Sequence, residues 1–167
     1  STAQRCTRSI RYRGHESARG GYFLSKLRIG FVLTGSFCTF AKVIPVIQAL
    51  IERGDSVTPI LSGSAGTLDT RFGTAAHWRQ ELTALTGVSP IDSIVSAEPI
   101  GPKALFDILI VAPCTGNTLA RLAHGLTDTP ATMAVKSHLR GERPVVLAVS
   151  TNDGLSGSAA NLGTLLN

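Results

Sequence analysis

Apolar runs alternate with amphipathic segments along most of the chain. Four short runs are almost wholly apolar, at residues 27–33, 57–61, 108–112 and 144–149. Runs of this kind are typical of strands that helices cover on both faces, as in a parallel sheet. Between them, residues 40–51, 74–86, 119–123 and 131–140 carry apolar side chains at helical spacing. Strands that alternate with helices predict a parallel, doubly wound α/β fold.

Three stretches are harder to assign from the pattern. Pro45 lies inside the first helical segment, so that helix either kinks there or begins later than Phe40. Residues 62–70 are rich in Gly, Ser and Thr and predict a loop, and residues 89–102 hold three prolines and predict a short strand set in loops rather than a helix. A last apolar segment begins at Ala159.

Small polar residues follow each of the four expected strands. The four clusters are residues 34–36, 62–64, 115–118 and 150–153. Any one of them alone is more often an ordinary turn or helix cap, because Ser, Thr, Asn and Gly are favoured at both. In a parallel sheet, however, all four lie along the same edge, where open α/β sheets bind their ligands. Their convergence therefore predicts one binding crevice.

The first cluster suits a phosphate group. Gly35 lets the backbone approach closely, Ser36 offers a hydroxyl, and the next helix would present free N–H groups. The glycine pattern of dinucleotide sites is missing, and Ser62 stands where such a site usually has an acidic residue for the ribose. The sequence therefore favours a monophosphate ligand over a dinucleotide.

Charge is distributed unevenly along the chain. The net charge is +5 over 167 residues, but six basic residues and one acid lie in residues 1–26, which leaves ten of each sign in residues 27–167. Residues 1–26 lack periodicity, and we expect a disordered basic arm with no role in the activity. A transit peptide is an alternative interpretation of an arm that is rich in Arg and Ser. Nucleic-acid binding would depend on the arm alone, so we do not expect it.

Composition bears on the cellular location and on the kinds of site that we expect. No apolar run reaches the roughly 20 residues of a membrane helix, so no membrane association is expected. The three cysteines, Cys6, Cys38 and Cys114, have no spacing suited to a metal or to a disulfide framework. They predict reduced thiols in a cytoplasmic protein without a metal site.

Several motifs carry a resemblance to a known family. Thr34-Gly35-Ser36 and residues 112–118, followed by Ala-x-x-x-x-Gly-Leu-x-Asp, resemble the flavoprotein family of FMN-binding cysteine decarboxylases and their relatives. Within it, residues 71–73, 91–102 and 143–153 resemble the B subunits of dipicolinate synthases more narrowly. The likeness covers residues 27–167, and we expect this flavoprotein-like domain to be truncated at its C-terminal end.

The resemblance implies a three-layer, Rossmann-like flavoprotein fold with a parallel sheet, and FMN as cofactor. It implies a share in oxidising a dihydro or hydroxytetrahydro precursor to dipicolinate during sporulation. The implied partners are a dicarboxylate substrate, the A subunit of dipicolinate synthase with NAD(P) bound to it, and further copies of the chain in a trimer or larger homo-oligomer. Asn152 matches a substrate-loop Asn and is the catalytic candidate. The implied cofactor-binding residues are Thr34, Gly35, Ser36, Ser62, Pro113, Thr115, Asn117 and Thr118.

Other functions stay open at this point. Ser150-Thr151 departs from the substrate loop of the decarboxylases, but a flavin-dependent decarboxylase or a flavin prenyltransferase shares the same broad fold. A non-catalytic partner with an empty pocket is a third possibility.

Several single residues have two interpretations each. Cys114 is either a flavin neighbour or nucleophile, or a buried core thiol, and His124 either moves protons or ends a helix. Candidates to hold substrate carboxylates are Arg71, Lys103, Arg121 and Lys136.

Overall fold

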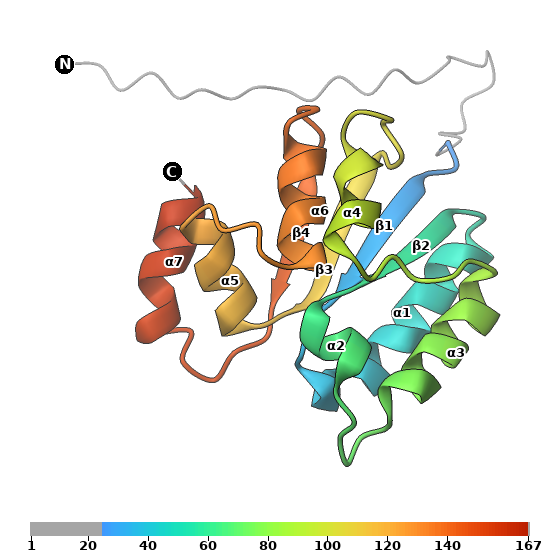
Figure 1. The fold of residues 1–167 in the computed structure, drawn as a ribbon, viewed down its shortest axis with the longest axis horizontal. Helices are drawn as coiled ribbons and strands as arrows, with labels where there is room; N and C mark the ends of the chain where they lie inside the picture. The colour runs from blue at the N-terminus through green and yellow to red at the C-terminus, as the bar shows by residue number, and fades with distance from the viewer. Residues whose placement is uncertain (1–24, 167) are drawn as a thin grey trace, which may run out of the picture.

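The fold is built on a four-stranded parallel sheet. In the computed structural model, which describes residues 25–166, the strands are β1 (Arg28–Leu33), β2 (Ser56–Leu61), β3 (Ile108–Cys114) and β4 (Val145–Val149). They pair in the order β2-β1-β3-β4, and every pairing is parallel (Figure 1). The predicted doubly wound α/β fold is confirmed. The predicted basic arm lies almost wholly outside the described residues.

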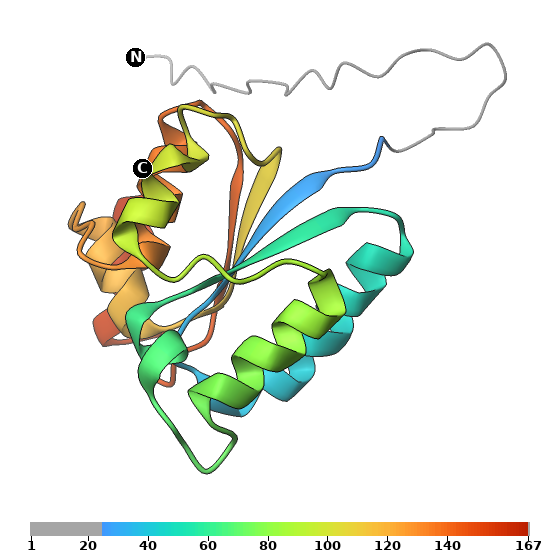
Figure 2. The same cartoon turned by 45° about the vertical axis from the view of Figure 1, so that its right-hand side comes forward.

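Helices cover both faces of the sheet (Figures 1 and 2). Helices α1 (Phe40–Glu52) and α3 (Ala75–Thr86) pack on one face, over a core that includes Phe31, Leu33 and Trp78. Helices α4 (Ile94–Ala97) and α6 (Pro130–Leu139) pack on the other face, over Val32, Leu109 and Val111. Because side chains alternate along a strand, Phe31 and Val32 reach opposite cores.

Two further helices lie beyond the β4 side of the sheet. Helix α5 (Gly116–Ala123) follows β3, and α7 (Gly157–Leu166) follows β4 and packs beside α5 (Figure 1). The strand at this end of the sheet is only partly covered, since Val146 is 47% exposed and Ala148 is also exposed. None of the helices in residues 25–166 is long and apolar enough to cross a membrane.

Side-chain caps explain where several helices begin. The hydroxyls of Thr74, Thr115 and Thr129 each accept a hydrogen bond from the backbone N–H three residues later. Such caps pair a backbone donor that the first turn of a helix leaves free. Helix α3 ends at Gly87, whose φ of 73° is in the left-handed region that glycine adopts easily. The longer helices therefore lie where the pattern of apolar residues predicts them.

Two segments differ from the sequence prediction because short caps fold them into helices. Ser62 caps a helix, α2 (Gly63–Thr67), inside the stretch that predicted only a loop. Within residues 89–102, Ser93 and Ser96 form a reciprocal capping box that starts α4, and a 3-10 turn, η2 (Glu98–Ile100), follows it. The predicted short strand is reduced to one parallel bridge between Ile91 and Ile60. The pattern missed these helices because four or five residues are too few to show a period.

The first helix settles the question that Pro45 left open. A 3-10 turn, η1 (Phe37–Thr39), leads directly into α1 at Phe40, and Pro45 lies inside the helix. Proline lacks one N–H, so only one helical hydrogen bond is lost there, and the buried Phe40 and Ile47 hold the helix on the sheet. The helix therefore does not start late.

The strand order fixes where a ligand can bind. From β1 the chain crosses to β2 on one side, and it later returns to β3 and β4 on the other side. The order therefore reverses between β1 and β3, and the crevice outside their carboxyl ends is the usual ligand position in sheets of this kind.

Candidate functional site

The loops after β1 and β3 are tied together by one buried hydroxyl. Thr34 is 1% exposed, and its Oγ1 donates to the carbonyl oxygen of Pro113 at 2.6 Å. The same Oγ1 accepts a hydrogen bond from the backbone N–H of Thr115 at 3.0 Å. Thr34 thus fixes the spacing of the two loops at the point where the strand order reverses.

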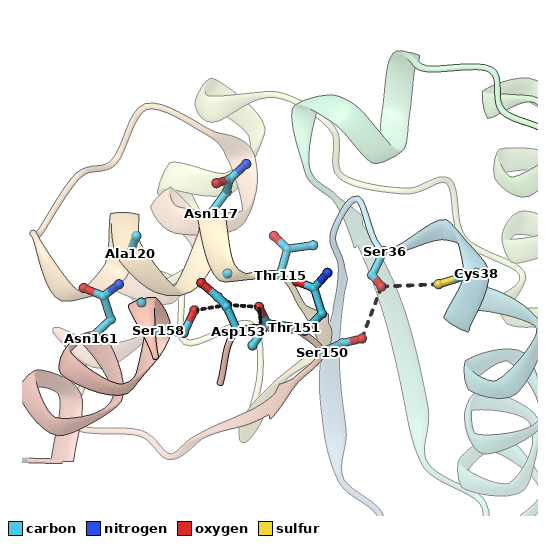
Figure 3. Close-up of a pocket in the computed structure, with 13 residues that line it drawn as sticks. Ser36, Cys38, Thr115, Asn117, Ala120, Ser150, Thr151, Asp153, Ser158 and Asn161 are labelled. Carbon is cyan, nitrogen blue, oxygen red and sulfur yellow. Dashed lines mark hydrogen bonds between the residues drawn. The ribbon is translucent and has the colours of Figure 1, made fainter. Parts of the chain in front are cut away.

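Ser36 links the first loop to the loop after β4. Its Oγ lies 3.2 Å from Ser150 Oγ and 3.8 Å from Cys38 Sγ (Figure 3). The loop after β2 meets the first loop from another side, because a Cβ added at Gly35 would lie 2.8 Å from Ser64 Oγ. Ser62 Oγ in turn lies 3.2 Å from Ser64 Oγ. All four loop tips are therefore in contact around the first one, as their positions in the sequence predicted.

A cavity of about 740 Å³ opens between these loops and the helices α5 and α7 (Figure 3). This volume lies in the range of small-molecule and cofactor sites. Nearly all of its lining side chains are small or polar, and they come from the loops after β1, β3 and β4, from the first part of α5 and from the first part of α7. The lining residues are Ser36, Cys38, Thr115, Gly116, Asn117, Ala120, Ser150, Thr151, Asn152, Asp153, Gly157, Ser158 and Asn161.

The predicted site residues fall into two groups. Ser36, Thr115, Asn117 and Asn152 line the cavity. The other five support its walls from behind, without lining it. Thr34 and Pro113 make the buried link described above, and Thr118 is buried and accepts a hydrogen bond from Thr115 Oγ1 at 3.0 Å. Gly35 and Ser62 face Ser64. Their assignment to a cofactor stays a prediction.

Several lining residues were not chosen from the sequence. Asp153 belongs to the fourth polar cluster, but only Asn152 was selected from it. Ser158 and Asn161 lie three residues apart on α7, so they share one helix face. The two polar side chains form a stripe on a largely apolar helix, and their three-residue spacing is the signal that could have identified both residues.

Asp153 is the centre of a small hydrogen-bonded cluster. Its Oδ1 accepts from the hydroxyl of Thr151 and, at 2.7 Å, from that of Ser158 (Figure 3). These two donors, the Thr151 hydroxyl first, lower the pKa of the Asp153 carboxyl from its ordinary value. A Cβ at Gly116 would lie 3.1 Å from Thr151 Oγ1 and 3.2 Å from Ser158 Oγ, so any larger residue would press on this cluster. The cluster fixes the loop after β4 against α5 and α7.

The two cysteines of the described chain have different surroundings. Cys38 is exposed at the cavity, beside Ser36. Cys114 is fully buried, and burial raises the pKa of its thiol to about 11. A thiol in that state is a poor nucleophile, so Cys114 acts as a small core residue.

The cationic candidates lie away from the cavity. Arg121 forms an ion pair with Asp128, and Arg71 lies over the Phe72 ring, 4.8 Å from its centroid. Lys136 lines a separate, mainly apolar groove of about 580 Å³, and Lys103 is outside the lining of both cavities. His124 is exposed at the end of α5, with Nδ1 2.9 Å from the carbonyl oxygen of Ala120. Within residues 25–166, no group of three or more His, Cys, Asp or Glu is placed to hold a metal ion.

The donor set fits a flavin mononucleotide. Amides at Asn117 and Asn161 offer both donors and acceptors, which the polar edge of a flavin ring requires, and Ser36 and Thr115 offer hydroxyls. Neither amide has a hydrogen-bond partner among the described residues, so both are free for a ligand. The residues present therefore suit the cofactor that the motifs implied.

Similarity to known proteins gives the class of protein first. The flavoprotein family model matches residues 19–159, so the chain belongs to the flavoprotein family. Within that family the chain groups with the B subunit of dipicolinate synthase, as the motifs predicted. It is 47% identical over 139 residues to that subunit of Bacillus subtilis (strain 168), a match that covers 83% of this chain and 70% of the relative.

Solved structures agree with this grouping. The crystal structure of the B subunit of dipicolinate synthase from Bacillus halodurans C is 40% identical, with a TM-score of 0.74 over 84% of this chain and 72% of that one. The structure of AnUbiX (PadA1) in complex with FMN and dimethylallyl pyrophosphate has a TM-score of 0.64 at 23% identity, over 84% and 72% of the two chains. The second likeness shows a shared fold alone. The expected flavoprotein fold is thereby confirmed.

Proposed function

We infer that this chain is the flavin-binding subunit of a dipicolinate synthase. In this proposal it contributes to oxidising a dihydro or hydroxytetrahydro precursor to dipicolinate during sporulation. The single observation that carries the proposal is the polar cavity at the β1–β3 switch point, in a chain 47% identical to the B subunit of a dipicolinate synthase. We further propose a cytoplasmic assembly with the NAD(P)-dependent, dehydrogenase-like A subunit of dipicolinate synthase, and self-association as a trimer or larger.

Three residues that line the cavity would hold the cofactor, and a fourth would shape the loop behind it. Ser36, at the tip of the first loop, would donate its hydroxyl to the phosphate, and Gly35 behind it lets the loop fold tightly against Ser64. Thr115 and Asn117, at the start of α5, would meet the ring and its side chain. When bound, a flavin supplies a hydride acceptor.

The remaining lining residues would orient the substrate. Asn152 is exposed at the cavity and offers an amide that can donate and accept. The cluster of Asp153, Thr151 and Ser158 fixes the loop that carries Asn152. A loop held in this way keeps the Asn152 amide in one position and limits the entry of water beside a bound ring.

An absorption spectrum of the purified protein tests the proposal directly. We expect flavin absorbance in the protein as isolated, or quenching of FMN fluorescence when FMN is added. A Ser36→Asp variant should lose this binding, since the added carboxylate repels the phosphate. Ser89→Asp is the matched control, because Ser89 is exposed and outside the cavity lining.

The outcomes separate the alternatives. Unchanged FMN binding in Ser36→Asp would contradict the phosphate position. A colourless protein that does not take up FMN, and that its partner still requires for activity, would favour a non-catalytic role. Release of carbon dioxide from a cysteinyl substrate would instead select the decarboxylase alternative.

A further inference from the structure

The cavity lining contains one side chain that carries a full charge at neutral pH, and it is an acid. Asp153 is that residue, and Cys38 is the only other ionisable group among the lining residues of the described chain. No Lys, Arg or His of residues 25–166 is present in the lining. A carboxylate without a nearby cation attracts a ligand group that donates a hydrogen bond or carries positive charge, and it repels anions.

Among residues 25–166, only one of the two oxygens of the Asp153 carboxylate accepts hydrogen bonds. Both hydroxyl donors, Thr151 and Ser158, reach Oδ1. No donor in residues 25–166 reaches Oδ2, which lies over Gly157 at the start of α7. A Cβ at Gly157 would lie 2.8 Å from Oδ2, so only glycine lets Oδ2 take this position. Oδ2 is therefore an acceptor without a donor from residues 25–166, on a side chain that lines the cavity and that two hydroxyls hold in place.

The rest of the lining shows which ligand group belongs beside Asp153. Carboxylates of a ligand would be repelled there and would find an amide donor at Asn152 instead. A ring nitrogen that carries a proton has the opposite preference, because it donates to an ionised oxygen. A reduced nitrogen heterocycle has such a nitrogen when it is an amine, an enamine or a protonated imine, and the neutral aromatic ring has none.

We propose that Asp153 is a specificity-determining residue whose Oδ2 accepts a hydrogen bond from the protonated ring nitrogen of a reduced heterocyclic dicarboxylate. This proposal rests on the proposed function and names the substrate feature that the site selects. An aromatic pyridine nitrogen has a lone pair instead of a proton, so it would face Oδ2 as a second acceptor. Asp153 thus retains the reduced ring and favours release of the aromatic one.

The experiment compares two probes of the same size. Piperidine-2,6-dicarboxylate carries a protonated ring nitrogen, and pyridine-2,6-dicarboxylate does not at neutral pH. Each is titrated into the FMN-loaded protein by calorimetry. We expect wild type to bind the piperidine probe at least about tenfold more tightly, the scale of one charge-assisted hydrogen bond. Asp153→Asn should remove most of that preference, because an amide can also donate to a pyridine nitrogen.

Two variants separate recognition from a structural role. Ser158→Ala removes a donor to Oδ1 but keeps the carboxylate, so it should loosen the loop and retain the preference for the piperidine probe. If Asp153 only stabilises the loop, Ser158→Ala and Asp153→Asn should behave alike. Asp128→Asn is the charge-matched control, since Asp128 pairs with Arg121 outside the lining.

The results that overturn the inference are distinct from those that overturn the function. FMN binding combined with no preference in wild type, including binding of neither probe, would overturn the inference alone. A preference that survives in Asp153→Asn would do the same. Failure of FMN to bind wild type would overturn the proposed function, and this inference with it.

Discussion

Replacing Thr34 by Val tests how the site is held together. Val has the shape of Thr but no hydroxyl, so the change removes both hydrogen bonds of Oγ1 and leaves the rest of the packing in place. The carbonyl of Pro113 and the N–H of Thr115 would then lose their partner beneath a side chain that is 1% exposed. Each unpaired buried group costs about 1–3 kcal/mol. With some relaxation, we expect the free energy of unfolding to fall by about 2–4 kcal/mol.

Urea unfolding measures this loss. For a small domain the slope is about 1–3 kcal/mol per molar urea, so the midpoint should fall by about 1–2 M with an unchanged slope. FMN affinity should fall as well, because Thr115 lines the cavity and loses its anchor. Thr34→Ser is the control, since it keeps the hydroxyl and loses one methyl group, worth about 1 kcal/mol. A midpoint shift below about 0.3 M in Thr34→Val, or equal losses in both variants, would refute the reasoning.

Three further predictions concern the rest of the fold. His138 is fully buried, and burial lowers the pKa of its imidazole, so the unfolded state binds the proton more readily. The free energy of unfolding should therefore hold its full value above the unfolded pKa of about 6.5 and fall as the pH drops below it. Urea unfolding at pH values on either side of that pKa should show a weaker pH dependence of this free energy in His138→Gln than in wild type. An unchanged pH dependence would contradict the assignment. In a Cys6→Ala variant, a thiol reagent should modify Cys38 rapidly and Cys114 only as the protein unfolds, because Cys114 is buried and the pKa of its thiol is raised. Rapid modification of both thiols would contradict this prediction. The end strand β4 exposes Val146, and uncovered apolar strand edges promote association of protein molecules. Val146→Lys should therefore scatter less light than wild type at high protein concentration. Equal scattering by the two proteins would show that this edge is not the contact.

Local signals in the sequence suffice to predict the strands and the longer helices. The four apolar runs predicted the four strands, since a run of five to seven apolar residues has few alternatives to a buried strand. In the structure, hydroxyl caps fix where the longer helices begin, and Gly87 fixes where α3 ends. The short helices α2 and α4 were missed, because their capping bonds at Ser62 and Ser93 decide the conformation over too few residues to show periodicity.

The sequence by itself determined the parallel α/β class, the polar strand ends and the flavoprotein grouping, because each is written in local pattern or motif. Only the tertiary structure decided which polar residues line the cavity. Thr34 and Asn117 look equally suitable in the sequence, yet one is buried as a link between loops and the other faces the cavity. The role of Asp153 also depends on α7 folding back beside α5, which brings Ser158 to its carboxylate. Such contacts arise from packing between distant segments, and no local pattern records them.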